Sequence, residues 1–172
     1  MKGILQTIER DGAPALAIRV GAEASSLKGQ ALSSLLGAKG CVVRKGGVES
    51  WGAEGAVETE DGLLLYGPPF EGRSLDEILG LASAGEASAI VAGGTEAALA
   101  RLATVAAGLS LAAERGMLPR SPTIHGLILG EEGELLALPP EPIRRAIKAC
   151  KGVAEAPALF PRSPRASAPA AE

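Results

Sequence analysis

The only histidine in this 172-residue sequence is His125, which lies in the segment TIHGLILGEEGELLALPP at residues 123–140. An imidazole serves as a general base or a metal ligand when a carboxylate, hydroxyl or thiol group stands beside it. No aspartate, serine or cysteine partner is evident near His125. We therefore expect a histidine that supports a hairpin by hydrogen bonding to the backbone.

Arg19 is the second residue that could do chemistry, and it lies in the segment PALAIRVG at residues 14–21. Its guanidinium could bind an anionic ligand. An arginine on a strand near a sheet edge more commonly lays its aliphatic stem on the sheet and its charge in solvent. A small-ligand enzyme that used Arg19 and His125 would need both side chains in one pocket, and their spacing does not indicate this.

Three glutamates, Glu131, Glu132 and Glu134, are close enough in sequence to suggest a metal site. They separate two apolar runs, so a solvated turn is the expected structure. The segment AGG at 92–94 is similar to a phosphate-binding loop, but it follows no clear strand and lacks the lysine of such loops. No catalytic, metal or cofactor site is expected at either place.

Cys41 and Cys150 are the only cysteines, and neither belongs to a CxxC or Cys/His pattern. Two isolated thiols are typical of a reducing cytoplasm, and no disulfide or zinc site is expected. Aromatic residues make up only 2% of the chain. We expect Trp51, Tyr66 and Phe70 in the core of the N-terminal half and in the linker after it, rather than lining a cleft.

The composition predicts one soluble domain whose core consists mainly of Ala and Leu, because 47% of the residues are hydrophobic. The net charge is −3, with both signs interspersed, which argues against the basic field of non-specific nucleic-acid binding. The longest apolar stretch, 87–113, is interrupted by Glu96 and Arg101. It therefore reads as a soluble helix rather than a membrane span.

Alternation and turn residues predict that the N-terminal half forms a small antiparallel sheet with one helix. The turn RDGAP separates the first two strands, and glycine-containing turns separate the later ones. The expected strands are 4–9 and 15–20, followed by two further strand candidates, 40–47 with the following 48–53, and 56–67; the expected helix is 25–36.

After residue 66 the pattern predicts helices and one hairpin. Ser74 and Glu77 form a capping box that would start a helix. The strongest helix prediction is 95–115, beginning at Thr95 and ending before Gly116, with the quoted hairpin and a short helix after it. Its expected apolar stripe consists of Leu99, Leu102, Ala106, Leu109 and Ala113. The opposite face is mostly Ala, so we expect something to cover it.

The order of these elements resembles the protein kinase fold over about residues 4–145. PALAIRVG is similar to the strand that carries the family's VAIK motif. LLLYGPPFEGRSLDEIL (63–79) is similar to the linker between the lobes and the helix after it. The segment 111–140 resembles the end of the long helix, the catalytic-loop histidine and the hairpin that follows. The implied fold is α+β: a small antiparallel sheet with one helix, a linker, and a truncated helical part with a β-hairpin.

The chemical groups of that family are missing where the resemblance would put them. Phosphoryl transfer needs a glycine-rich phosphate cover, a lysine, a base aspartate and metal-binding Asp and Asn residues. Only thirteen residues precede PALAIRVG, which leaves no room for the cover. Arg19 stands at the lysine position, IHG passes directly into the hairpin, and Pro139 stands where the metal-binding aspartate would begin. We therefore expect no enzyme activity.

These observations predict a kinase-like domain at 1–150 and a disordered Pro/Ala/Ser-rich tail at 151–172. The domain would comprise a small lobe at about 1–66, a linker at 67–73 and a partial helical lobe at 74–150. The expected function is a non-catalytic binding or scaffold module, with a regulatory role in the cytoplasm. A protein partner, or a missing C-terminal helical half, would pack on the helix 95–115. An unrelated α+β interaction domain and the small-ligand enzyme remain alternatives.

Overall fold

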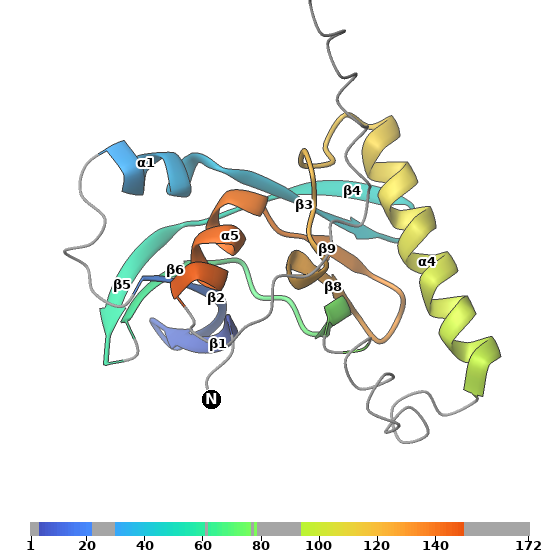
Figure 1. Cartoon of the computed structure of the whole chain (residues 1–172), viewed down its shortest axis with the longest axis horizontal. Coiled ribbons are helices and arrows are strands. Elements are labelled where there is room, and N and C mark those ends of the chain that lie inside the picture. The colour runs from blue at the N-terminus through green and yellow to red at the C-terminus, as the bar shows by residue number, and fades with distance from the viewer. Residues whose placement is uncertain (1–3, 22–29, 61, 77, 79–93, 150–172) are drawn as a thin grey trace, which may run out of the picture.

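The protein is described from a computed structural model, which covers residues 4–21, 30–60, 62–76, 78 and 94–149. Within these ranges the chain is α+β, with two antiparallel sheets and three helices (Figure 1). Glu77 of the expected capping box, the first residues of the expected helix 25–36 and the expected tail 151–172 lie outside the described residues.

The first sheet has four strands in the order β1-β2-β6-β5. The strands are β1 (Leu5–Arg10), β2 (Ala13–Gly21), β5 (Gly55–Thr59) and β6 (Gly62–Gly67). The hairpin β1–β2 confirms the first predicted turn, and both of its central residues, Asp11 and Gly12, have positive φ angles of 52° and 80°. A two-residue turn of this kind matches the twist of the flanking strands. β2 pairs with β6, which leads directly into the linker.

The second sheet has five strands in the order β4-β3-β9-β8-β7. They are β3 (Lys39–Arg44), β4 (Gly47–Gly52), β7 (Arg73–Ser74), β8 (Leu127–Leu129) and β9 (Leu135–Ala137). The hairpin β3–β4 was expected in the same sheet as β1 and β2, and this expectation is wrong. β3 instead pairs with β9, with Cys41 opposite Ala137.

The burial of β3 explains why it needs this second partner. Its four central residues, Gly40 to Val43, are all buried, so both faces and both edges of the strand require cover. Gly40 permits the close approach, because a Cβ atom there would fall on the backbone carbonyl oxygen of Ala137. The sheet therefore joins residues from the two halves of the sequence.

Three helices flank the sheets: α1 (Gln30–Gly37), α4 (Gly94–Glu114) and α5 (Pro140–Ala149). α4 agrees with the predicted helix 95–115 to within a residue, and Gly116 follows it with a positive φ of 68°. α5 begins at Pro140, where the missing N–H costs nothing. α5 buries Pro142, Ile143 and Ala146, and it packs against β2.

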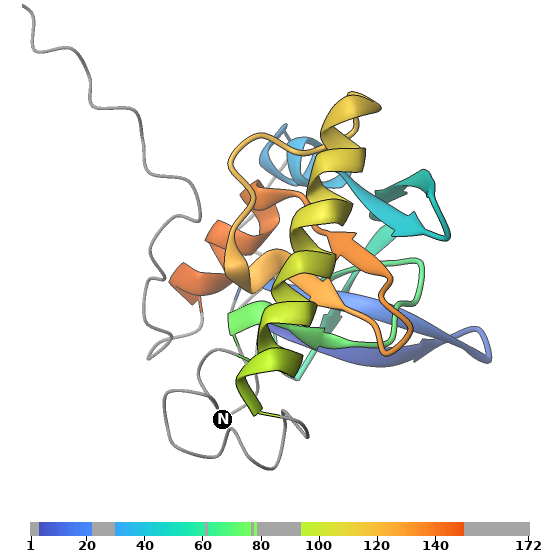
Figure 2. The same cartoon turned by 90° about the vertical axis from the view of Figure 1, so that its right-hand side faces the viewer.

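The apolar stripe predicted for α4 is wrong. The helix lies across the second sheet (Figure 2) and buries Val105, Gly108 and Ala112 on it. Leu99 and Leu102 of the predicted stripe are 59% and 44% exposed, Ala106 and Ala113 are exposed, and only Leu109 is partly buried. Ala and Leu occur on all sides of this helix, so the sequence contains too little contrast to select the buried face.

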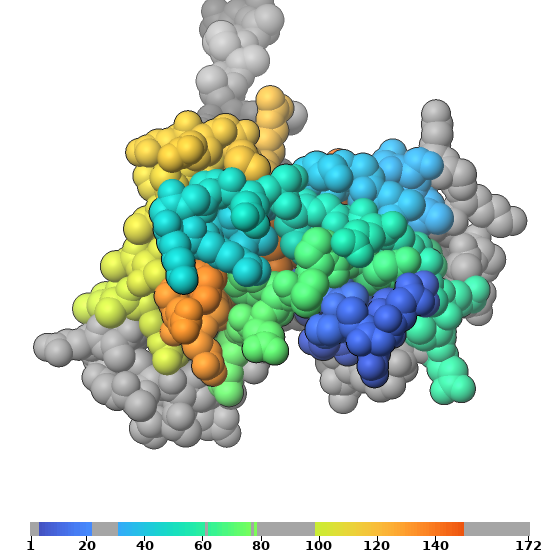
Figure 3. All heavy atoms as spheres, turned by 180° about the vertical axis from the view of Figure 1, so that it is seen from behind, coloured from blue at the N-terminus to red at the C-terminus, as the bar shows by residue number. Residues whose placement is uncertain are grey.

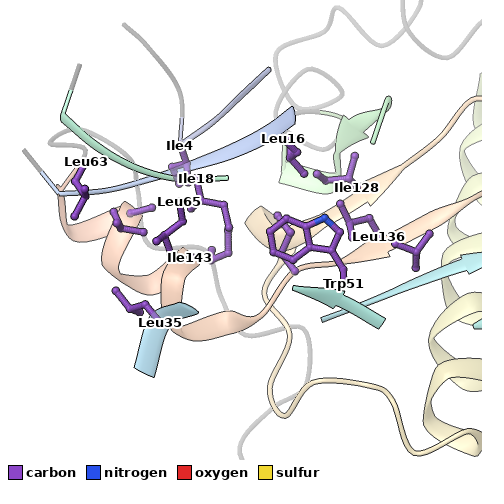
Figure 4. Close-up of a cluster of buried hydrophobic side chains, with 14 residues drawn as sticks. Ile4, Leu16, Ile18, Leu35, Trp51, Leu63, Leu65, Ile128, Leu136 and Ile143 are labelled. Carbon is purple, nitrogen blue, oxygen red and sulfur yellow. The ribbon is translucent and has the colours of Figure 1, made fainter. Parts of the chain in front are cut away.

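Two hydrophobic cores cover the two faces of the second sheet. The first lies between the two sheets and α5, and it contains Ile18, Leu65, Trp51, Leu136 and Ile143 (Figure 4). The second lies between the second sheet and α4. Trp51 is 1% exposed, so its predicted place in the core is confirmed. None of the described helices has the length and apolar character that a membrane crossing requires.

Candidate functional site

A cavity of about 430 Å³ lies where β1, the linker 67–73 and the second sheet meet. On the reverse side of the molecule the linker runs between β1 and the hairpin β8–β9 (Figure 3). We call this space the β1 cavity. The residues that line it are Ile4, Leu5, Gln6, Thr7, Leu16, Phe70, Gly72, Ser74, Asp76, His125 and Ile128.

His125 forms part of the wall of the β1 cavity together with Asp76. It occupies the short helical turn η2 (Ile124–Gly126), directly before β8, and is only 7% exposed. Its Nδ1 atom lies 2.9 Å from Oδ2 of Asp76. A carboxylate can only accept a hydrogen bond, so Nδ1 carries the proton and donates it. The Nε2 atom of His125 is buried and has no hydrogen-bond partner among the residues that the structure describes.

The expected backbone partner of His125 is therefore replaced by a carboxylate. Asp76 stands 49 residues earlier in the sequence. The pairing of β7 with β8, with Ser74 opposite Ile128, brings the two side chains together. Ser74 directly precedes the helical residues Leu75 and Asp76, as expected for a residue that starts a helix. The only sequence signal for Asp76 was its place in the first turn of that helix.

The linker is held against the sheet by aromatic residues. The indole N–H of Trp51 donates a hydrogen bond of 3.0 Å to the carbonyl oxygen of Pro68. Phe70 was expected in the linker rather than at a cleft, but it also lines the β1 cavity. The guanidinium of Arg44 lies over the Phe70 ring, 5.6 Å from its centroid, in the range of a cation–π contact.

Arg19 does not join His125 in this cavity. Leu16, Ile18 and Val20 of β2 face the first core, and side chains alternate along a strand. Arg19 therefore lies on the other face of β2, and it is not among the residues that line the cavity. The structure thus does not bring together the two residues that the small-ligand enzyme would require.

The three glutamates border a second space of about 870 Å³ between α4 and the turn 130–134. Glu131 and Glu132 are exposed, as expected for a solvated turn, and the Glu134 carboxylate accepts a hydrogen bond from the Glu132 backbone N–H. Within the described ranges, no group of three His, Cys, Asp or Glu side chains is placed to hold a metal ion. Of the segment 92–94, only Gly94 is described, and it begins α4.

The chain passes from η2 directly into β8, without a loop after His125. β8 begins at Leu127, immediately after Gly126, and the N–H of Leu138 bonds back to the carbonyl oxygen of Gly126. Pro139 is fully buried between β9 and α5. No carboxylate stands between His125 and the turn that begins at Gly130.

α4 presents an apolar surface on the side away from the sheet, which we call the outer face of α4. Leu99 and Leu102 are the large hydrophobic residues that the described part of the chain leaves exposed. Small residues surround them on the same exposed surface: Ala103, Ala106, Ala107, Ser110 and Ala113. Among the side chains of α4 that the structure describes, Arg101 is the only charged one before Glu114.

Comparison of the chain with protein-family models, curated proteins and solved structures finds no match. The β1 cavity and the outer face of α4 are the two features of the described residues that bear on function.

Proposed function

We propose that this chain is a non-catalytic, kinase-like binding module, and that it binds a protein partner through the outer face of α4. The partner would present an apolar surface, such as one side of a helix. A cytoplasmic location and a regulatory or scaffold role are part of the proposal. The free thiol of Cys41 is compatible with a reducing compartment.

The order of the strands supports the kinase-like part of the proposal. The resemblance requires residues 15–20 to pair with residues 63–66, and β2 pairs with β6 in this register, with Ala17 opposite Tyr66. β6 then leads into the linker, which Trp51 fixes through Pro68. One departure is the hairpin β3–β4, which joins β9 rather than the first sheet. An unrelated α+β interaction domain would use the same outer face.

The absence of a loop after His125 supports the non-catalytic part. Phosphoryl transfer needs carboxylates that hold Mg²⁺ against the phosphates. β8 starts at Leu127, directly after Gly126. The chain therefore has no room after His125 for a base aspartate or a metal-binding asparagine. A thermal-shift titration with ATP and Mg²⁺ tests this part, and a Mg²⁺-dependent stabilisation of several degrees would contradict it.

The observation that carries the proposed function is the exposure of Leu99 and Leu102 within a surface of small residues. Fully burying an exposed leucine contributes about 1.5–3 kcal/mol, and these two side chains, each about half exposed, would contribute roughly half of that. Alanines beside it let a partner helix approach closely without losing side-chain entropy. A solvated helix ordinarily carries charged side chains on this face, and only Arg101 and Glu114 are charged between Leu99 and the end of α4.

Site-specific photo-crosslinking in the source cells tests the proposal. A photoreactive phenylalanine analogue would replace Leu102, and in a matched control it would replace Glu132, which is also exposed but lies outside the outer face. We expect one recurrent crosslinked protein from Leu102 and none of it from Glu132. That protein would then be purified and titrated against the wild-type chain, Leu102→Glu and Glu132→Gln.

Leu102→Glu should weaken this binding by at least about tenfold, or about 1.4 kcal/mol, because a carboxylate would replace a buried leucine at the interface. Glu132→Gln should bind like the wild type. Circular dichroism would verify that both variants keep their helices. Equal crosslinking from the two positions, or equal affinity of Leu102→Glu and the wild type, would overturn the proposal.

A further inference from the structure

We propose that the β1 cavity is a binding site for a small organic amine, in which a cationic amino group is attached to an apolar body such as an aromatic ring. This site is separate from the outer face of α4, and the inference does not depend on the proposed function. It rests on three properties of the cavity: its polar wall, its charge and its apolar wall.

The polar wall consists of Asp76 and His125. The bond to His125 uses Oδ2 of Asp76, and the Asp76 side chain is one-third exposed. Oδ1 has no hydrogen bond within the described part of the chain and can accept one from a ligand. Because His125 donates through Nδ1, its ring keeps the carboxylate oriented.

The Nε2 atom of His125 lies on the edge of the imidazole ring away from Asp76. In the neutral imidazole this atom is an acceptor, and among the described residues it has no partner although it is buried. Buried acceptors of this kind are nearly always satisfied, by protein, by water or by a ligand. Because Nδ1 and Nε2 lie on opposite edges of the ring, an ammonium group that bonds Oδ1 of Asp76 does not reach Nε2, so Asp76 alone holds the ammonium group.

The charge of the cavity selects a cation over an anion. Asp76 is the only carboxylate among the described residues that line the cavity, and no lysine or arginine is among them. Arg44 lies over Phe70 and is itself exposed, so solvent screens its charge. A phosphate or carboxylate ligand would face Asp76 without a basic partner.

The apolar wall sets the class of body that the amine carries. Leu16, Phe70 and Ile128 line the cavity, and Figure 4 shows Leu16 and Ile128 beside each other where the two sheets meet. Sites for small organic ligands occupy about 300–1,000 Å³. The β1 cavity, at about 430 Å³, is at the small end of this range and suits a single ring system with a short side chain.

Titration of the full chain with tryptamine, followed by ¹H–¹⁵N NMR spectroscopy, tests the inference. Indole-3-propionate has the same ring with an acidic side chain, and 3-ethylindole has no charge; both serve as ligand controls. We expect saturable shifts for tryptamine at residues of β1, the linker and η2. The affinity for tryptamine should exceed that for indole-3-propionate by at least tenfold.

Asp76→Asn should remove most of this preference for the amine, whereas Glu131→Gln, the same change at an exposed carboxylate outside the cavity, should leave it unchanged. The NMR spectrum of each variant would verify its fold. The comparison of the three ligands on the wild-type chain tests the inference even if Asp76→Asn unfolds. Equal or tighter binding of indole-3-propionate, shifts confined to other regions, or no saturable binding of tryptamine at millimolar concentration would overturn it.

Discussion

Replacing Gly40 by alanine should separate two strands that join distant parts of the sequence. Gly40 lies in β3, next to β9. A Cβ atom at this position would fall on the carbonyl oxygen of Ala137 and would come within 3.0 Å of Cδ of Pro139. A backbone oxygen cannot rotate away as a side chain can. The two strands would therefore have to move apart.

The size of the effect follows from two contributions. Inserting a methyl group into a packed region costs about 1–3 kcal/mol, and disturbing a hydrogen bond between the strands costs about 0.5–1.5 kcal/mol. We expect Gly40→Ala to lower the free energy of unfolding by about 1.5–4.5 kcal/mol. Gly37→Ala is the matched control, because a Cβ atom there meets nothing within 4 Å. It should change the stability by less than about 0.5 kcal/mol.

Urea denaturation would measure both variants, followed by circular dichroism and by the fluorescence of Trp51. This residue is the only tryptophan, and it lies directly opposite Gly40 in the pairing of β3 with β4. If Gly40→Ala proved as stable as Gly37→Ala, the pairing of β3 with β9 would be refuted. That result would be expected if the hairpin β3–β4 belonged to the first sheet.

The structure leads to three further predictions. Leu102→Glu should change the free energy of unfolding by less than about 0.5 kcal/mol, whereas Val105→Glu, on the buried face of the same helix, should cost about 3 kcal/mol or more in urea denaturation. Burial raises the pKa of the Cys41 thiol above its ordinary value of 9.0, so in a Cys150→Ser background iodoacetamide should react with it far more slowly in the folded chain than in urea. Since folding raises this pKa, the folded chain should lose free energy of unfolding as the pH rises above 9 and the thiol ionises. Trp51→Phe should cost about 1–3 kcal/mol in thermal or urea unfolding, because the linker carbonyl group that it bonds would lose its partner; unchanged stability would contradict that role.

Local patterns predicted several elements of the fold correctly. The turn Asp11–Gly12, the helix α4 and the hairpin β8–β9 each depend on residues that are neighbours in sequence, and their signals lie in those residues. The partner of the hairpin β3–β4 could not be predicted in the same way. β3 is apolar enough to belong to either sheet, and its partner β9 follows about ninety residues later.

The site was harder to predict than the fold. Asp76 and His125 meet only because β7 pairs with β8, and β7 consists of two residues without a strand pattern of their own. The buried face of α4 was missed for another reason. Gly108 allows the helix to lie close to Leu135, while the larger Leu99 and Leu102 remain outside. Close packing here favours the smallest side chains, which a hydrophobicity pattern does not identify.

The second sheet combines strands from both halves of the sequence, and this affects folding during synthesis on the ribosome. β3 and β4 emerge early, but β8 and β9 are translated only after the whole of α4 has been made. Until then one edge of β3 has no neighbour, and an unprotected strand edge of this kind can pair with other chains. We expect nascent chains that stall before residue 127 to require chaperones, and to aggregate when these are depleted.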